Sequence, residues 1–296
     1  MNDEEKPICS TKFLSFDYSK VEGIPELKIK VEFLNKMLSR VPDKNNKRVL
    51  EVGVGAGETT ILLLDIFKEV VVVEPNSESC NKLIKKIGKE GLSNVKFIKS
   101  KIEDADLSNE KVSTSNLRVI STSLKLNLCK SASQNSEHYD QLAFNMKGIH
   151  EKFDNIILSC VIEHLKYPVQ VLKKLSTYLN EGGIMHIIIA QANSLHRLLG
   201  VKEGVIANTG DLSPTDIELG HYRVYTPELL YDQIKASGLK ISFEQSFYLK
   251  PLTISMLSGI SMDTHRALSS LGEDFPELAC YIYVEATRKD FKIQKR

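Results

Sequence analysis

The sequence contains no tryptophan, few cysteines and no long apolar segment. Its five cysteines are an odd number without close pairing, which is not the pattern of a disulfide framework or a zinc knuckle; they are Cys9, Cys80, Cys129, Cys160 and Cys280. No apolar run approaches the roughly 20 residues needed to span a bilayer. The N-terminus is acidic and polar, unlike a secretory signal. We therefore expect a soluble protein of the cytoplasm.

The sequence also has no excess of positive or of negative charge. Lys and Arg total 39 and Asp and Glu total 38, which gives a formal net charge of +1. This balance argues against a dedicated nucleic-acid binder, although a local basic face stays open. Hydrophobic residues make up 42% of the 296 residues and charged residues 26%, so a mostly disordered chain is excluded. The length fits one large domain, or one domain with an appendage.

Segments typical of strands and helices alternate along the chain. We expect strands at 49–53, 69–74, 95–98, 153–159, 184–190, 239–248 and 280–286. Helices are expected at 26–41, 58–67, 77–89, 167–179 and 226–238, with 180–183 ending the fourth of them. This alternation predicts an α/β fold with a parallel sheet that is covered by helices on both faces. Ligands of such sheets bind at the carboxyl ends of the strands.

Three segments lie outside this pattern. Residues 1–25 are expected to form a loose N-terminal arm. Residues 104–150 are rich in Ser and lack periodicity, so they read as an insertion, either a lid or, more simply, a mobile surface loop. Residues 193–225 are polar and leave the carboxyl end of the fifth strand, which is where a substrate cover would lie.

A glycine-rich loop joins the first strand to the next helix. The loop has Gly53, Gly55 and Gly57, and Glu58 stands where a dinucleotide fingerprint would have its third glycine. An acid at the start of the loop, Glu51, suits a cationic group better than a phosphate. A turn that serves only strand–helix packing is the alternative.

A second acid ends the following strand. Glu74 lies 21 residues after Gly53, where a carboxylate can accept both hydroxyls of a ribose. The two acids and the glycines together fit a nucleoside that carries a positive charge and no phosphate, as S-adenosylmethionine does.

Four motifs carry a resemblance to a known family. They are VLEVGVGAG at 49–57, VVEP at 72–75, FDNIILSCVIEHL at 153–165 and LNEGGI at 179–184. Over 26–103 and 150–286 the chain resembles the class I S-adenosylmethionine-dependent methyltransferases, and within them the branch of the ubiquinone-biosynthesis O-methyltransferases. The resemblance implies a three-layer, doubly wound, Rossmann-like sheet of seven strands, parallel except the last. It also implies a single domain over 26–296.

The resemblance implies a role for each motif residue. The methionine part would be held by Glu51 and the backbone of Gly53, Gly55 and Gly57. The ribose would be bound by Glu74 beside Pro75 and Asn76, the adenine by Ile102 and Glu103, and the sulfonium edge by Ser159 and Cys160. The product would be S-adenosylhomocysteine.

The chain departs from the family pattern after the fourth strand. Cys160 stands where some relatives carry a carboxylate that helps to bind a divalent metal, which leaves Glu163 and His164 as an incomplete set of ligands. We therefore predict no metal site. The sequence LSCV at 158–161 lacks the Asn/Asp-Pro-Pro-aromatic signature, which argues against methylation of adenine N6 or protein glutamine.

Three histidines are the candidate catalytic residues. His164 follows the fourth strand, His196 follows the fifth, and His221 precedes the helix capped by Thr226. Candidate acceptor-binding residues lie beside the last two; they are Asn193, Arg197, Tyr222 and Arg223. The alternative is that this region is a loop held by its own hydrogen bonds. His186 lies inside an apolar strand and is expected to be a core residue.

The sequence predicts a methyltransferase for a small-molecule acceptor, at oxygen, with nitrogen or carbon left open. An RNA or protein methyltransferase and an inactive, methyltransferase-like binding subunit are the alternatives. We expect a monomer or a homodimer, with no nucleic-acid partner and no transmembrane segment.

Overall fold

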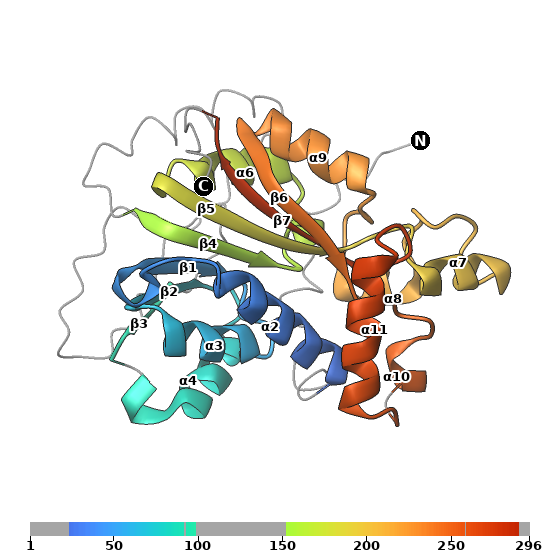
Figure 1. Ribbon diagram of the computed structural model, residues 1–296, viewed down its shortest axis with the longest axis horizontal. Helices are drawn as coiled ribbons and strands as arrows, with labels where there is room; N and C mark the ends of the chain where they lie inside the picture. The colour runs from blue at the N-terminus through green and yellow to red at the C-terminus, as the bar shows by residue number, and fades with distance from the viewer. Residues whose placement is uncertain (1–23, 92, 99–151, 258, 290–296) are drawn as a thin grey trace, which may run out of the picture.

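The computed structural model describes residues 24–91, 93–98, 152–257 and 259–289 (Figure 1). Three predictions fall outside these residues: the arm at 1–25 apart from its last two residues, the adenine contacts Ile102 and Glu103, and the insertion at 104–150.

Seven strands form one sheet. They are β1 (Arg48–Val52), β2 (Glu69–Val73), β3 (Val95–Ile98), β4 (Phe153–Ser159), β5 (Leu179–Ala190), β6 (Leu239–Phe247) and β7 (Tyr281–Arg288). Their order across the sheet is β3-β2-β1-β4-β5-β7-β6. The pairs from β3 to β5 are parallel, whereas β7 runs antiparallel to both of its neighbours. The predicted fold class is therefore confirmed.

Helices cover both faces of the sheet (Figure 1). One face packs against α6 (Pro168–Ser176) and α9 (Pro227–Ala236). The other packs against α2 (Pro25–Leu38), α3 (Glu58–Ile66), α4 (Ser77–Gly91) and α11 (Met262–Asp274). Shorter elements complete the described chain: η2 (Lys44–Asn46), η3 (Ile162–His164), α7 (Leu195–Lys202), α8 (Pro214–Leu219) and α10 (Ile254–Leu257). In the described chain, no helix is long and apolar enough to cross a membrane.

Local sequence explains why these elements form where they do. β2 contains four consecutive valines, all of them buried, as expected for a strand that is covered on both faces. α9 begins as predicted, because the Thr226 hydroxyl accepts from the Leu229 N–H at 3.2 Å and Pro227 occupies the first turn. It ends before Gly238, whose φ of +86° few other residues adopt.

One predicted boundary is wrong. The helix expected at 167–179 ends at Ser176, and Leu179 already belongs to β5, where it pairs with Phe153. Residues 180–183 were expected to stop the helix, but they lie within β5 at an irregularity of the β4–β5 register. Asn180 Nδ2 donates to Asp154 Oδ1 there at 2.8 Å. Pairing with β4 therefore outweighs the helical pattern of this segment and makes it part of a strand.

The segment 193–225 contains two helices that the sequence analysis did not predict. α7 begins directly after Ser194, and α8 begins at a capping box formed by Ser213 and Asp216. A backbone bridge between Gln191 and Tyr225 joins the two ends of the segment. The segment therefore leaves the carboxyl end of β5 and returns to it. Its helices α7 and α8 lie on the same side of the molecule as α11 (Figure 1).

Candidate functional site

The glycine loop lies between the carboxyl end of β1 and α3. Gly53 has a φ of +77° and its N–H donates to the Val73 carbonyl at 2.9 Å, which ties the loop to the end of β2. Gly57 has a φ of +92°, and a Cβ at this position would lie 2.9 Å from Leu83 Cδ1. With Gly55 also at positive φ, the loop needs glycine for its backbone path.

Glu51 lies under this loop and is almost fully buried. The Thr60 hydroxyl donates to Glu51 Oε2 at 2.6 Å. Burial raises the pKa of Glu51 to about 8, against the effect of the Thr60 hydrogen bond, and the charge of Glu74 adds to the rise. The two acids predicted from the sequence are therefore electrostatic neighbours.

Glu74 lies at the carboxyl end of β2 and is buried. Its carboxylate accepts from the Val54 N–H at 3.0 Å and from the Asn76 N–H at 2.7 Å. Burial raises the pKa of Glu74, although these two hydrogen bonds act in the opposite direction. Asn76 in turn accepts from the Glu78 N–H at 2.8 Å, so the sequence Glu74-Pro75-Asn76 forms a fixed turn into α4.

Cys160 follows β4 directly, next to Ser159, and has a φ of +55°. Its N–H donates to the Ile188 carbonyl at 2.8 Å, and its Sγ lies 3.7 Å from the Nζ of Lys30. Burial raises the pKa of the Cys160 thiol to about 12, so the thiol is neutral at pH 7. The structure thus brings Cys160 to the same edge of the sheet as the glycine loop, because β4 is the neighbour of β1.

Glu163, His164 and His221 form a compact cluster. One potential ligand atom from each side chain lies within 4.8 Å of the others. The two imidazole rings meet edge to face, with 4.6 Å between their centroids. The Tyr222 N–H donates to the Glu163 carbonyl at 2.9 Å, which fixes the segment before α9 against η3.

Burial controls the charges in this cluster. It lowers the pKa of His164 to about 3, with the charge of His221 as the next cause. It also raises the pKa of Glu163. A neutral imidazole with so low a pKa is a weak base at pH 7, which reduces the case for His164 as the proton acceptor.

The three side chains could hold a divalent metal. Two imidazoles and a carboxylate are ligands that suit transition metals such as zinc better than magnesium. Glu163 Oε2 is buried and has no hydrogen-bond partner among the described residues, which is the state that a cation would relieve. His221 supplies the ligand that the sequence analysis lacked when it considered Glu163 and His164 alone.

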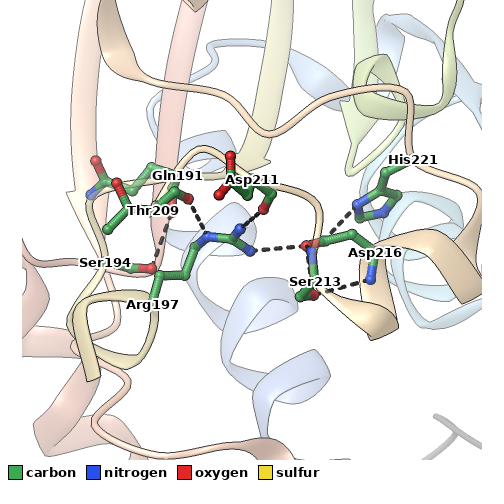
Figure 2. A network of polar contacts seen from close by, with 8 residues as sticks. All are labelled: Gln191, Ser194, Arg197, Thr209, Asp211, Ser213, Asp216 and His221. Carbon is green, nitrogen blue, oxygen red and sulfur yellow. Dashed lines mark hydrogen bonds and ion pairs between the residues drawn. The ribbon is translucent and has the colours of Figure 1, made fainter. Parts of the chain in front are cut away.

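Asp216 connects His221 to the rest of the cover (Figure 2). Its Oδ1 lies 2.9 Å from His221 Nδ1, and its Oδ2 accepts from Arg197 Nη1 at 3.0 Å. The Ser213 hydroxyl and N–H donate to the same Oδ2 at 2.6 and 2.8 Å. Burial opposes the charge of this carboxylate, but its hydrogen bonds outweigh burial and hold the pKa of Asp216 below its ordinary value.

Both candidate arginines donate to the protein itself. The Arg197 guanidinium also donates to the carbonyls of Thr209 and Asp211 (Figure 2). Arg223 donates to the carbonyls of Ile162, Leu165 and Lys166. These contacts support the alternative in which the arginines pin the cover segment, over an acceptor-binding role.

The remaining candidates differ in their surroundings. Asn193 is exposed, and Tyr222 is half-buried beside the cluster. Burial lowers the pKa of His196 to about 3, and its Nδ1 has no partner among the described residues. His186 is a core residue as predicted, since its ring nitrogens lie 2.7 Å from the Tyr283 hydroxyl and 2.9 Å from Asn155 Oδ1.

Five residues of this region had little or no signal in the sequence. Asp216 had a signal, because Ser213 and Asp216 have the spacing of a capping box. Glu26 and Lys30 are spaced i, i+4 on the inward face of α2, which is unusual for charged residues. Lys250 and Tyr281 had no local signal, since they reach the region only through the order of the strands.

A family model described as a methyltransferase domain matches residues 27–242. The match begins in α2 and ends in β6, so it includes the glycine loop, both acids and the cluster of Glu163, His164 and His221. A search among curated proteins finds no match to the sequence.

Several solved structures share the fold at low sequence identity. An S-adenosylmethionine-dependent methyltransferase from Leishmania major has a TM-score of 0.56 and 11% identity, covering 94% of this chain and 80% of that one. The N-methyltransferase NodS from Bradyrhizobium japonicum, in complex with S-adenosylhomocysteine, has a TM-score of 0.50 and 12% identity, covering 95% and 96%. The (4+2)-cyclase SpnF has a TM-score of 0.52 and 13% identity, covering 87% and 80%. Such likenesses show the fold alone.

Proposed function

The chain belongs to the S-adenosylmethionine-dependent methyltransferases, and from this premise we propose that it methylates a small-molecule acceptor at oxygen. The observation that carries the proposal is the His221–Asp216 pair at the carboxyl edge of the sheet. A hydroxyl acceptor needs a base when it attacks a sulfonium, whereas the donor itself is already activated.

The donor would lie over the ends of β1 and β2. There the backbone of the glycine loop would follow the methionine part, with Glu51 below it and Glu74 at the ribose beside Pro75 and Asn76. The charges support this placement, because two neighbouring buried carboxyls are costly without a cation, and the donor carries both an ammonium and a sulfonium. Ser159 and Cys160, at the end of β4, would then lie beside the methyl group.

His221 would act as the base. A carboxylate at its Nδ1 favours the tautomer with the proton on that nitrogen, so Nε2 becomes the acceptor. His164 would position the acceptor instead, since its low pKa leaves it weakly basic. A divalent metal held by Glu163, His164 and His221 would occupy Nε2 of His221, because Nδ1 lies against Asp216. The metal would then take the place of His221 as base and activate the acceptor hydroxyl by polarising it.

The cover at 193–225 favours a small acceptor over a macromolecule. Asp216 and Arg197 hold this segment against itself, and Arg223 holds it against η3 and the loop that follows. A segment held in this way at the carboxyl end of β5 would enclose a metabolite and obstruct an extended chain.

The proposal is tested with S-adenosylmethionine labelled in its methyl group, incubated with separate pools of metabolites, RNA and protein. We expect label in the metabolite pool, bound through an ether or ester oxygen. The His221→Ala variant should lose at least about 100-fold in kcat, the lower range for a general base, while its affinity for S-adenosylhomocysteine stays unchanged. Asp232→Asn, on the exposed part of α9, is the control for a local change of charge.

Other results would replace the proposal. Label confined to RNA or protein would favour the macromolecular alternative. Full affinity for S-adenosylhomocysteine without labelling of any pool would favour a binding subunit. A His221→Ala variant with undiminished kcat would remove the base from the mechanism.

A further inference from the structure

A second group of buried charges lies on the acceptor side of the sheet. Glu26 and Lys30 come from α2, Lys250 follows β6, and Tyr281 begins β7. These residues meet near Cys160, although Glu26 and Lys250 are 224 residues apart in the sequence. The proposed donor site and base use none of the four.

The carboxylate of Glu26 accepts hydrogen bonds from two of these residues, Lys250 and Tyr281. Lys250 Nζ donates to its two carboxylate oxygens at 3.3 and 3.5 Å, and the Tyr281 hydroxyl donates to Oε1. Glu26 and Lys250 are both buried. Burial opposes the charge on Glu26, but Lys250 and the Tyr281 hydrogen bond lower its pKa overall, so this pair is ionised and neutral in sum.

Lys30 is charged but forms no direct ion pair within the described part of the chain. Burial opposes the charge of its ammonium, but Cys160 and the acids Glu26 and Glu163 raise its pKa overall. Among the residues that the structure describes, it is in no ion pair, and its ammonium donates only to Cys160 Sγ at 3.7 Å. A neutral thiol is a weak acceptor. The ammonium also lies 5.3 Å from the centroid of the Tyr281 ring, a cation–π contact that leaves its donors open.

The position of Lys30 relates its ammonium to the reaction. Cys160 ends β4, at the place assigned above to the methyl group, so the Lys30 ammonium lies on the side from which an acceptor would approach. Two acids, Glu51 and Glu74, lie under the proposed donor. Two lysines lie on the acceptor side together with the acids Glu26 and Glu163. The ammonium groups of this side complement an anionic acceptor.

We propose that Lys30, assisted by Lys250, binds an oxyanion of the methyl acceptor, a carboxylate or a phosphate. The inference rests on the proposed function, because it assigns the acceptor to the side of the sheet where β4 and β5 end. Lys250 has one donor beyond its two contacts with Glu26, and Lys30 has at least two beyond its contact with Cys160.

A purely structural ion-pair network does not account for this arrangement. Lys30 joins no ion pair of such a network among the described residues, and at least two of its ammonium donors are left over after the contact with Cys160. His196 is a second group in need of a partner, since its Nδ1 is buried and unpaired among the described residues. After burial, the charge of Lys250 is the next cause that lowers the pKa of His196, which places this imidazole near the same lysine.

The experiment measures binding of small probes to the protein saturated with S-adenosylhomocysteine. The anionic probes are acetate, benzoate, inorganic phosphate and phenyl phosphate, and the matched controls are acetamide, benzamide and benzylamine. We expect at least one anion to bind about tenfold or more tightly than its uncharged counterpart, as one charge-assisted hydrogen bond gives. The carboxylate and phosphate probes then distinguish the two sources of the oxyanion.

Two variants on the same helix locate the effect. Lys30→Met should remove the preference for the anion and retain the affinity for S-adenosylhomocysteine. Lys28→Met removes an equal charge from an exposed position of α2 and should leave the preference intact. Lys30→Met is preferred to a change at Lys250, which would leave the buried Glu26 without its ion pair.

Each outcome is decisive. An anion preference that is lost in Lys30→Met and kept in Lys28→Met supports the inference. Equal binding of all probes, tighter binding of benzylamine, no probe binding at all, or a preference that survives Lys30→Met would overturn it. Failure to bind S-adenosylhomocysteine in the first place would instead refute the proposed placement of the donor.

Discussion

Binding of S-adenosylmethionine should release a proton from Glu51. Burial and the neighbouring Glu74 raise the pKa of Glu51 to about 8 in the free protein. At pH 7 this carboxyl is therefore protonated in about nine of ten molecules. The ammonium of the methionine part favours the ionised form, so binding at pH 7 should release up to about 0.9 proton per ligand.

The same linkage sets the pH dependence of the affinity. Below the pKa of Glu51, each unit of pH should raise the affinity by up to about tenfold, and the rise should level off above pH 8. Calorimetry in two buffers of different ionisation enthalpy measures the released proton directly, and a pH series of dissociation constants gives the slope.

Replacement of Glu51 by Gln removes the titrating group while it retains the shape of the side chain. The variant should bind with little proton release and with a weaker pH dependence. At pH 8 it should lose about 1.5 to 3 kcal/mol of binding free energy, the value of a hydrogen bond to a charged group. Asp65→Asn, at an exposed position of α3, makes the same chemical change away from the site and should behave as the wild type.

A second readout concerns the free protein. A carboxyl with a raised pKa in the folded state costs stability as pH rises above 4.5, the value of the unfolded chain. Glu51→Gln should therefore be more stable than the wild type by about 2 to 4 kcal/mol at pH 7, from the shift of the pKa. Wild-type binding without proton release, or a variant with the full pH dependence of the wild type, would refute the charge assigned to Glu51.

Three further predictions follow from the same structure. Burial lowers the pKa of His186 to about 3, so its contribution to stability is complete above pH 6.5 and is lost as pH falls towards 3. His186→Gln should reduce the slope of the unfolding free energy against pH by about 1.4 kcal/mol per pH unit in that range. An unchanged slope would contradict a neutral, buried imidazole. Gly57→Ala should lower the unfolding free energy by about 1 to 3 kcal/mol because of its φ and of Leu83 at 2.9 Å; denaturant titration checks this, and Gly210→Ala, with open space around it, is the control. Added Co²⁺ should give a visible absorption band in the wild type that is lost in Glu163→Gln and His221→Ala, and equal bands in all three proteins would show that the metal binds elsewhere.

Strand positions and the donor motifs were predictable because their signals are local. β2 is a run of valines, and the glycine loop needs its residue type for its own backbone path, whatever lies around it. Where a neighbouring element decides the outcome, local reasoning failed. Residues 180–183 have the composition of a helix stop, yet pairing of Leu179 with Phe153 draws them into β5.

The roles of the polar residues were less predictable than their presence. Arg197 and Arg223 have the side chains expected of an anion site, but the structure turns their donors towards carbonyls of the cover and of the loop after β4. The low pKa of His164, which makes it a weak base, arises only in the folded chain, from burial and then from the charge of His221. The exposure and the hydrogen-bond partners of a side chain set its role and its basicity, and a sequence motif does not encode them.

By itself, the sequence determined the α/β sheet, the glycine loop and the two acids that suit a cationic cofactor, because each depends on residues close together in the chain. The tertiary structure alone decided which polar residues meet across distant parts of the chain. It placed Lys30 at Cys160 across 130 residues, Lys250 at Glu26 across 224, and His221 against Glu163. The physical reason is that these contacts arise from the order of the strands, which brings the ends of β4, β6 and β7 to α2, and no local pattern encodes that order.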